Sequence, residues 1–136
     1  MGRLLAVDLG AKRVGLALSD PRQRLASPLA TLAFKGERKL LAELLTLIRE
    51  KEVEAVIIGL PLREDGSEGR GCQMARGLAG KLEGRGVPTV LWDERYSSRE
   101  AEALLKEGGL KRRRAVGKID RVAASLILED YLSSLA

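Results

Sequence analysis

Acidic side chains occur at three places in this sequence where a metal site could be built. Asp8 lies inside the apolar run LLAVDLG, and Asp120 follows a strongly basic segment. Asp93 and Glu94 stand together at the end of another apolar run. Hard cations such as Mg²⁺ prefer carboxylate oxygens, and two ions about 4 Å apart activate a water and stabilise the leaving oxygen of a phosphodiester. These acids therefore predict metal-dependent phosphodiester hydrolysis.

Asp8 is the acid whose surroundings most favour a functional role. An aspartate inside an apolar strand costs free energy unless a partner or an ion satisfies it. Strand alternation places Ala6 on the same face as Asp8, so this face is not plainly solvated. The alternative is an aspartate near a strand end that a neighbouring N–H group satisfies. We favour the functional interpretation.

The other acids allow two interpretations each. Adjacent strand residues point to opposite faces, so one of Asp93 and Glu94 faces a site at the carboxyl end of the strand and the other does not. An ordinary polar strand end explains this pair equally well. Asp120 could cap the last helix or complement its dipole. Helical spacing, however, puts Ala124 and Ile127 on its side, which points its carboxylate toward the sheet.

The composition removes several classes of active site. The sequence contains no histidine and one cysteine, Cys72. Without histidine, Ser-His-Asp triads, Cys-His pairs and histidine-zinc sites are excluded. One cysteine forms no internal disulfide, which agrees with a reducing cytoplasm. No apolar run reaches the length of a membrane span, and a strand begins almost at once, so we expect no membrane partner and no signal peptide.

Basic side chains are concentrated immediately before the last acid. Residues 106–121 hold seven basic and two acidic side chains, so this stretch carries a net charge of +5, the same as the whole chain. Such a patch favours a polyanion, whose phosphates it would deliver to the acids, although charge runs are often only solvated surface. The residues that we assign to nucleic-acid binding are Lys12, Arg13, Lys111, Arg112, Arg113, Arg114, Lys118 and Arg121.

Lys118 is also a catalytic candidate. It stands two residues before Asp120 and could orient a water molecule or balance charge. The alternative is a solvated lysine in a basic loop. Aromatic residues make up 3% of the chain, so base stacking should contribute little. We therefore expect recognition of the phosphate backbone and of shape rather than of base sequence.

Hydrophobic periodicity and turn residues divide the chain into strands and helices. Short connections join the first three strands, which should be antiparallel, and helices lead to two later strands, which should run parallel to the first. This predicts an α/β fold, a mixed five-stranded sheet with helices on both faces, in a single domain over residues 1–136. The expected strands are 4–9, 13–19, one within 26–34, 55–59 and 87–92, and the expected helices are 37–51, 72–83, 97–107 and 119–135.

Two details of these elements bear on the site. Pro28 marks the third strand as an edge candidate, because proline cannot donate to a strand ladder. The last helix should begin near Ile119, which would place Asp120 in its first turn. The residues expected to face inward from this helix are Val122, Ala123, Leu126 and Ile127.

Four motifs resemble those of the YqgF-type family, in the same order and at similar spacings over nearly the whole chain. They are AVDLGAKRVGLALSD at 6–20, VIIGLPL at 56–62, WDERYSS at 92–98 and GKIDRVAASLILEDYL at 117–132. Members of this family are described as candidate Holliday junction resolvases and as nucleases that mature the precursor of the small-subunit ribosomal RNA. The resemblance implies a ribonuclease-H-like fold.

The resemblance also assigns roles to the acids. Asp8 matches the acid of the family's first strand, Glu94 that of its Asp-Glu-Arg motif, and Asp120 that of its Lys-x-Asp helix start. We choose Glu94 over Asp93 because its longer side chain reaches inward from a strand end. The three carboxylates would then form one site for Mg²⁺ or Mn²⁺, with two ions expected.

Three functions compete for this sequence. We favour a metal-dependent nuclease acting on structured RNA or branched DNA, in maturation of the 5′ end of pre-16S rRNA or in Holliday junction resolution. A non-catalytic nucleic-acid-binding or ribosome-assembly factor would use the same basic segment but leave Asp8 unexplained. Half of an actin-like ATPase is disfavoured, because such enzymes clasp ATP between two domains.

The expected partners follow from the favoured function. The ribosome or a pre-ribosomal particle is a further expected partner. The protein is expected to be a monomer or a homodimer, and junction resolution would favour the dimer because it makes two symmetric cuts.

Overall fold

The computed structural model describes residues 2–94 and 116–135, without the side chains of 116–119. The helix expected over 97–107 and the basic residues 111–114 lie outside the described residues. So does the side chain of Lys118, although its backbone belongs to the last helix.

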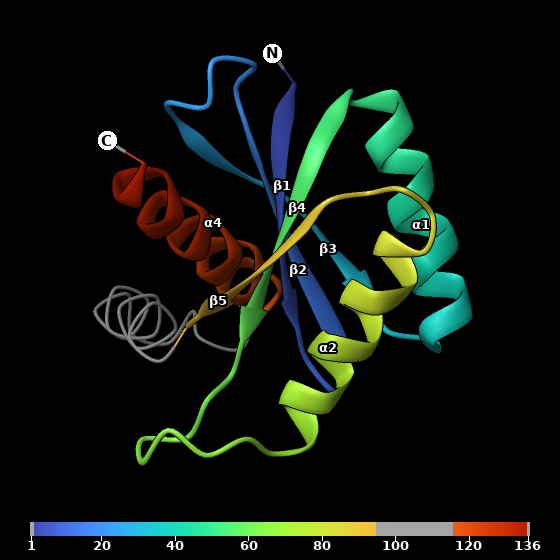
Figure 1. Ribbon diagram of the computed structural model, residues 1–136, viewed down its shortest axis with the longest axis vertical. Helices are drawn as coiled ribbons and strands as arrows, with labels where there is room; N and C mark the ends of the chain where they lie inside the picture. Colours follow the sequence, from blue (N-terminus) through green and yellow to red (C-terminus); the bar gives the residue numbers. More distant parts are fainter. Residues whose placement is uncertain (1, 95–115, 136) are drawn as a thin grey trace.

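The five strands form one mixed sheet with the order β3-β2-β1-β4-β5 (Figure 1). Neighbouring strands are antiparallel from β3 to β1, and β4 runs parallel to both β1 and β5. The strands are β1 (Arg3–Leu9), β2 (Arg13–Ser19), β3 (Ala26–Ala33), β4 (Val53–Leu60) and β5 (Thr89–Asp93). The predicted α/β fold is confirmed, and so is the edge position of β3, the strand that contains Pro28.

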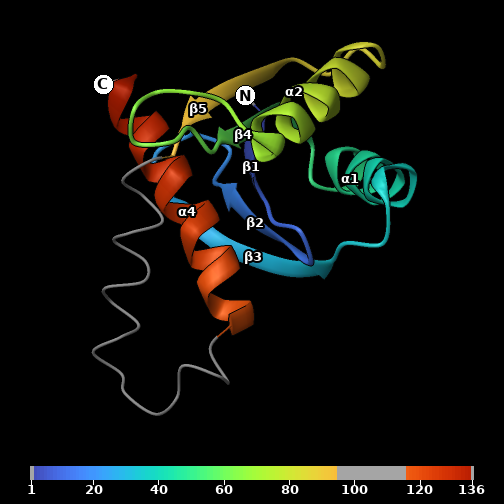
Figure 2. The same ribbon diagram turned by 90° about the horizontal axis from the view of Figure 1, so that it is seen from below.

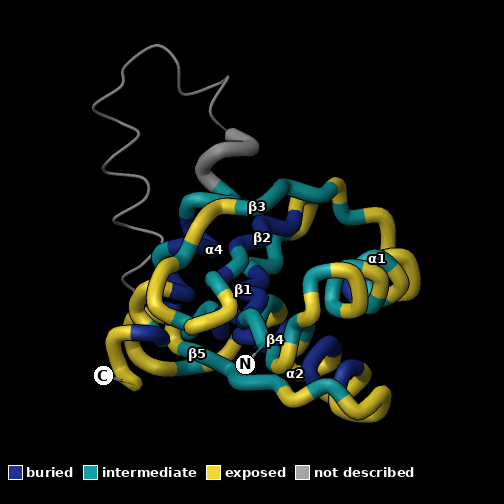
Figure 3. Tube along the Cα trace, turned by 90° about the horizontal axis from the view of Figure 1, so that it is seen from above, coloured by how far each residue is buried: buried dark blue, intermediate teal, exposed yellow. Residues whose placement is uncertain are grey.

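Helices cover both faces of the sheet. Figure 2 shows α1 (Glu37–Glu50) and α2 (Arg70–Glu83) on one side and α4 (Val116–Ser134) on the other. Alternation along β1 supplies both cores: Leu5 and Val7 pack toward α1 and α2, whereas Leu4 and Ala6 pack toward α4. In Figure 3 the central strands are accordingly buried, while the outer surfaces of the helices are exposed. No helix in the described part of the chain has the length and apolarity needed to cross a membrane.

The last helix begins earlier than its sequence pattern indicates. It starts at Val116, so Asp120 is its fifth residue. The interpretation of Asp120 as a cap or first-turn acid is therefore wrong, because the helix already has a full turn before it. The inward stripe also differs from the prediction: Val122 and Leu126 are only half-buried. The apolar side chains that the helix does bury are Ala123, Ala124, Ile127, Leu128 and Leu132.

The position of α4 on the sheet depends on Gly15 in β2. A Cβ atom added at Gly15 would lie 1.9 Å from the main-chain oxygen of Asp120 and 3.0 Å from the nitrogen of Arg121. Only a residue without a side chain permits this approach of helix to strand. This contact fixes which side of α4 packs on the sheet. It therefore also determines which residues of the helix are buried and how closely Asp120 approaches the strands.

Candidate active site

Asp8 and Glu94 lie together on the face of the sheet that α4 covers. Asp8 shares this face of β1 with Leu4 and Ala6, which pack in the α4 core. Glu94 follows β5 directly, and its main-chain N–H donates to the oxygen of Leu60 at 3.3 Å. A side-chain hydrogen bond joins the two carboxyl groups. Residues that are 86 positions apart in the sequence thus form one acidic pair.

The strand between the two acids makes room for their contact. β4 separates β1 from β5, and its Gly59 faces the same side as Asp8 and Glu94. A Cβ atom at Gly59 would lie 2.1 Å from Oε2 of Glu94 and 2.9 Å from Cδ1 of Ile127. The carboxyl group of Glu94 therefore occupies the space that any other residue at position 59 would fill.

Glu94, and not Asp93, is the acid of the β5 end that reaches this pair. Glu94 is 8% exposed and hydrogen-bonded to Asp8. Asp93 belongs to the other parity of the strand and is exposed. This placement agrees with our choice of Glu94 over Asp93. Its physical cause is that adjacent residues of an extended strand point to opposite faces of the sheet.

Burial and mutual repulsion perturb both carboxyl groups. Burial raises the pKa of Asp8 to about 6, the hydrogen bond with Glu94 opposes that rise, and the charge of Asp120 adds to it. Burial also raises the pKa of Glu94 to about 9, with further contributions from the charge of Asp8 and their hydrogen bond. At neutral pH, Glu94 is protonated and donates to the ionised Asp8, so the pair carries one negative charge.

One oxygen of this pair has no partner. Oε2 of Glu94 is buried and forms no hydrogen bond with any described residue. A buried oxygen without a partner costs free energy, and folding alone gives no reason to keep it. The donor set fits a hard cation, which takes carboxylate oxygens. Across residues 2–94 and 120–135, however, no three metal-ligating side chains are already gathered as a closed ligand set.

Asp120, the third predicted acid, lies near the pair but is bonded elsewhere. Its charge contributes to the raised pKa of Asp8, so the two carboxylates are within electrostatic range. Its Oδ2, however, accepts a hydrogen bond from Nε of Arg13 at 2.9 Å. The structure thus brings Asp8 and Glu94 into contact and holds Asp120 beside them through an arginine.

The basic residues predicted to bind nucleic acid are only partly described. Arg13 forms the ion pair with Asp120, and Lys12 is exposed in the turn between β1 and β2. Nη1 of Arg121 lies 3.5 Å from Oγ1 of Thr31 on β3. Two of these residues, Arg13 and Arg121, thus lie beside the α4 end that carries Asp120.

An aromatic contact holds the end of β5 against α4. Nε1 of Trp92, two residues before Glu94, donates to Oδ2 of Asp130 at 2.7 Å. Its ring also meets the ring of Tyr131 edge-on, with centroids 5.3 Å apart. These two contacts tie the strand that carries Glu94 to the helix that carries Asp120.

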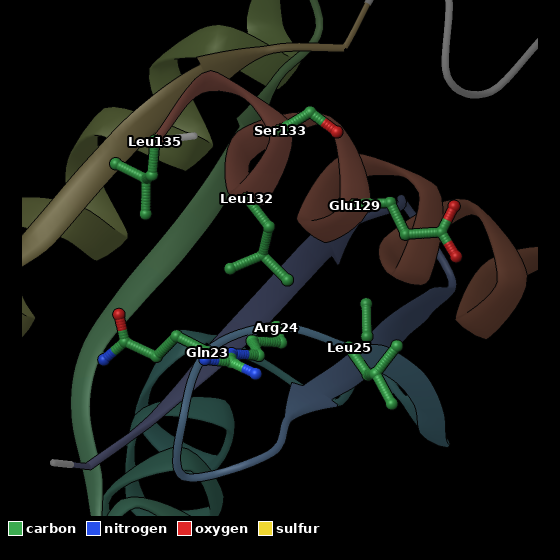
Figure 4. Close-up of a pocket in the computed structure, with 8 residues that line it drawn as sticks. Gln23, Arg24, Leu25, Glu129, Leu132, Ser133 and Leu135 are labelled. Atoms are coloured by element: carbon green, nitrogen blue, oxygen red, sulfur yellow. The ribbon is translucent and has the colours of Figure 1, made fainter.

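A separate groove lies at the far end of α4 (Figure 4). It has a volume of about 630 Å³, and none of the three acids lines it. The side chains of Leu25, Leu132 and Leu135 line it together with Arg24 and Glu129. Because these residues belong to the β2–β3 connection and the last turns of α4, this groove and the acidic pair are different features of the molecule.

Sequence reasoning missed the glycines on which the site depends. Gly15 and Gly59 both stand inside strands, where a glycine often marks a close approach of another group. That signal was present in the motifs GLALSD and VIIGLPL. The ion pair of Arg13 with Asp120 had no local signal, since 107 positions separate the two residues.

Comparisons with known proteins agree with this architecture. The RuvX family, described as Holliday junction resolvase, matches residues 2–134. A candidate pre-16S rRNA nuclease of Syntrophus aciditrophicus is 40% identical over 135 residues, which cover 98% of this chain and 90% of that protein. A protein of the same description from Anaeromyxobacter dehalogenans is 43% identical, with 98% of both chains covered.

Solved structures show the same fold at low sequence identity. RuvC of T. thermophilus, in complex with a Holliday junction substrate, superposes with a TM-score of 0.60 at 16% identity and covers 100% of this chain and 97% of its own. The fowlpox virus Holliday junction resolvase gives a TM-score of 0.63 at 14% identity, with 98% and 99% covered. The expected ribonuclease-H-like fold is thereby confirmed.

Proposed function

Because this chain belongs to the RuvX family of Holliday junction resolvases, we propose that it hydrolyses phosphodiester bonds in structured nucleic acid at the site of Asp8, Glu94 and Asp120. Nuclease activity is the function that both the family and the relatives at about 40% identity support. The observation that carries the assignment to this site is the contact of half-buried Asp8 with buried Glu94, one of whose oxygens no described residue satisfies.

The acidic pair is difficult to explain as a purely structural feature. A buried carboxyl group in contact with a half-buried one destabilises the fold unless a proton or a cation lies between them. An apolar pair would satisfy the α4 core better. A non-catalytic nucleic-acid-binding factor would have no use for such a pair, which is why we prefer the enzyme.

We propose that a divalent cation, Mg²⁺ or Mn²⁺, is held by Asp8 and Glu94 with Asp120 as the third acid. Bound there, it would supply Lewis acidity to the water and to the phosphate, and this class of reaction commonly uses two ions. The chain's own contribution is to give up the proton shared by Asp8 and Glu94, so that both carboxylates become available. Gly59 leaves room for the carboxyl group of Glu94, and Gly15 lets the main chain of Asp120 approach the sheet.

The basic residues near Asp120 would hold the polyanion. Lys12 lies in the turn after β1, the strand of Asp8, and Arg13 of β2 pairs with Asp120. Arg121 follows Asp120 on α4 and lies near Thr31 of β3. We keep Lys118, Lys111, Arg112, Arg113 and Arg114 as proposed contacts on their positions in the sequence. Contacts of this kind fix the phosphate backbone without reading base sequence.

For the substrate, we propose the precursor of 16S rRNA first and branched DNA second. The relatives that share about 40% identity over nearly the whole chain are described as candidate pre-16S rRNA nucleases. The solved complex with a Holliday junction shares 16% identity and therefore supports the fold alone. The family description keeps junction DNA as the second candidate.

The experiment compares both substrates side by side. Purified protein is incubated with a 5′-extended 16S rRNA fragment and with a four-way DNA junction, in Mg²⁺, in Mn²⁺ and in EDTA. We expect metal-dependent cleavage, and we expect Asp8→Asn to lower its rate at least about 100-fold while binding changes little, because asparagine keeps the size of the side chain but loses its charge. Glu129→Gln, which removes an exposed charge near the other end of α4, is the matched control. Normal cleavage by Asp8→Asn would refute the site.

A further inference from the structure

Arg13 is bonded to Asp120, the predicted acid that stands outside the Asp8–Glu94 pair. Nε of Arg13, at the start of β2, donates to Oδ2 of Asp120 on α4 at 2.9 Å. The side chain of Arg13 is 44% exposed and that of Asp120 is 22% exposed. The guanidinium can therefore reach both solvent and the carboxylate that the site would require.

The strand register places this ion pair beside Asp8. Asp8 of β1 pairs directly with Gly15 of β2, so the main chain of Gly15 is the immediate neighbour of Asp8. The main-chain oxygen of Asp120 lies over Gly15, and Arg13 is two residues away on the same face of β2. The main chain of Asp120 is thus held over Gly15, the strand partner of Asp8, and only a rotamer change of its short side chain would be needed for its carboxylate to leave Arg13.

Three carboxylates crowded together without a cation would repel one another. For Asp120, the guanidinium of Arg13 relieves this repulsion by supplying a positive charge. A guanidinium also matches a phosphate group, which it binds through two parallel hydrogen bonds. A partly exposed ion pair contributes little net free energy, so a stronger partner can break it.

From this geometry we propose that Arg13 is a positioning residue with two alternating partners. Without ligands it holds the carboxylate of Asp120, and when the cation and the nucleic acid bind, Asp120 turns to the cation while Arg13 passes to a backbone phosphate. The proposal rests on the proposed function, and it adds a coupling between metal binding and phosphate binding. Two simpler roles differ from it: a structural clamp between β2 and α4, and a phosphate contact independent of Asp120.

The first test measures binding of Mn²⁺ to the protein alone, by calorimetry, without nucleic acid. In Arg13→Met the cation no longer competes with the guanidinium for Asp120, so Mn²⁺ should bind about two- to fivefold more tightly than to the wild type. Arg13→Lys, which restores a charge without the fork of donors, should lie closer to the wild type. Arg49→Met removes the same charge at the exposed end of α1 and should change nothing.

Each result of the first test decides between the roles. Tighter binding in Arg13→Met supports the exchange, whereas equal or weaker binding overturns it and leaves a clamp or an independent phosphate contact. If Arg13→Met does not fold, Arg13→Gln, which also removes the positive charge, replaces it, and equal or weaker Mn²⁺ binding in Arg13→Gln overturns the proposal. If the wild type and Asp8→Asn both fail to bind Mn²⁺, the proposed metal site itself is wrong, and that failure is distinguishable from failure of the exchange.

The second test measures the salt dependence of binding to the four-way junction, with Ca²⁺ replacing Mg²⁺ and with EDTA. Each phosphate contact contributes about −0.9 to the slope of log affinity against log salt. Loss of Arg13 should therefore make the slope less steep by about one unit in Ca²⁺. In EDTA, the wild type and the Arg13 variant should have the same slope, because in the wild type Asp120 still holds the guanidinium and keeps it from the phosphate. Equal changes in both conditions, or no change in either, would overturn the exchange.

Discussion

Glu94 donates a hydrogen bond to Asp8 across the bare main chain of Gly59, and this contact makes one acidic pair from two strands that are not neighbours. Without a cation the pair holds a proton, and binding of a cation would release that proton to solvent. The following predictions test whether the pair, and the glycines that accommodate it, have this role.

Glu94→Gln should separate stability from activity. Glutamine has the size of the protonated glutamate and can still donate to Asp8, so the free energy of unfolding at pH 7 should stay within about 1 kcal/mol of the wild type. Cleavage in Mg²⁺ should fall at least about 100-fold, because an amide cannot release a proton to become a charged ligand. Cleavage rates and urea unfolding curves check both parts.

Asp93→Asn is the matched control for that variant. Asp93 is adjacent in the sequence but exposed on the other parity of β5. We expect its cleavage rate to stay within about twofold of the wild type, as is usual for a surface substitution. A reversed result, with Asp93→Asn inactive and Glu94→Gln active, would show that the wrong acid of the two has been assigned.

The stability of the metal-free protein should fall as the pH rises. The pKa values of Asp8 and Glu94 are raised by burial from 3.8 to about 6 and from 4.5 to about 9. The folded state therefore binds more protons than the unfolded state, and this contribution is complete below pH 4 and is lost as the pH passes through about 6 and about 9. Urea unfolding in EDTA between pH 5 and pH 9 measures it.

The variant that carries both Asp8→Asn and Glu94→Gln gives the control for the pH series. It has neither titrating group, so the same interval should produce a smaller loss of stability than in the wild type. Added Mg²⁺ should stabilise the wild type more at pH 8 than at pH 5, because the cation needs deprotonated carboxylates. Parallel curves for the wild type and the double variant would contradict the raised pKa values.

Gly15→Ala should destabilise the protein strongly. The added methyl group would lie 1.9 Å from the main-chain oxygen of Asp120, and a main-chain atom cannot move aside without the helix. We expect a loss of about 3 kcal/mol in the free energy of unfolding. Gly77→Ala in α2, where nothing lies within 4 Å of the added atom, should instead stabilise the protein by up to about 1 kcal/mol.

Gly59→Ala should damage metal binding more than folding. The methyl group would meet Oε2 of Glu94 and Cδ1 of Ile127, which are both far ends of side chains and can shift. A stability loss of about 1–2 kcal/mol is expected. The affinity for Mn²⁺ should fall about tenfold or more, because Glu94 loses the place from which it reaches Asp8. Unaltered Mn²⁺ affinity would mean that Glu94 does not bind the cation.

Local features of the sequence predict the sheet and the position of the first acid. Apolar alternation along β1, short connections between the first three strands and helical stretches before β4 and β5 are such features, and they predict the strand directions. The half-buried position of Asp8 follows from its place at the end of an apolar run. The start of α4 was predicted three residues late, because the residues before Ile119 lack an apolar stripe and their helical state is visible only in the folded chain.

Which side chains meet at the site depends on how the strands and helices pack. Alternation indicates that Asp93 and Glu94 point to opposite faces, but not which face lies under α4. That choice depends on the register from β5 through β4 to β1. The pairing of Arg13 with Asp120 depends likewise on the approach of α4 to Gly15. Local sequence encodes periodicity and conformational preference, whereas contacts between distant residues are set by how whole elements pack, which no single segment specifies.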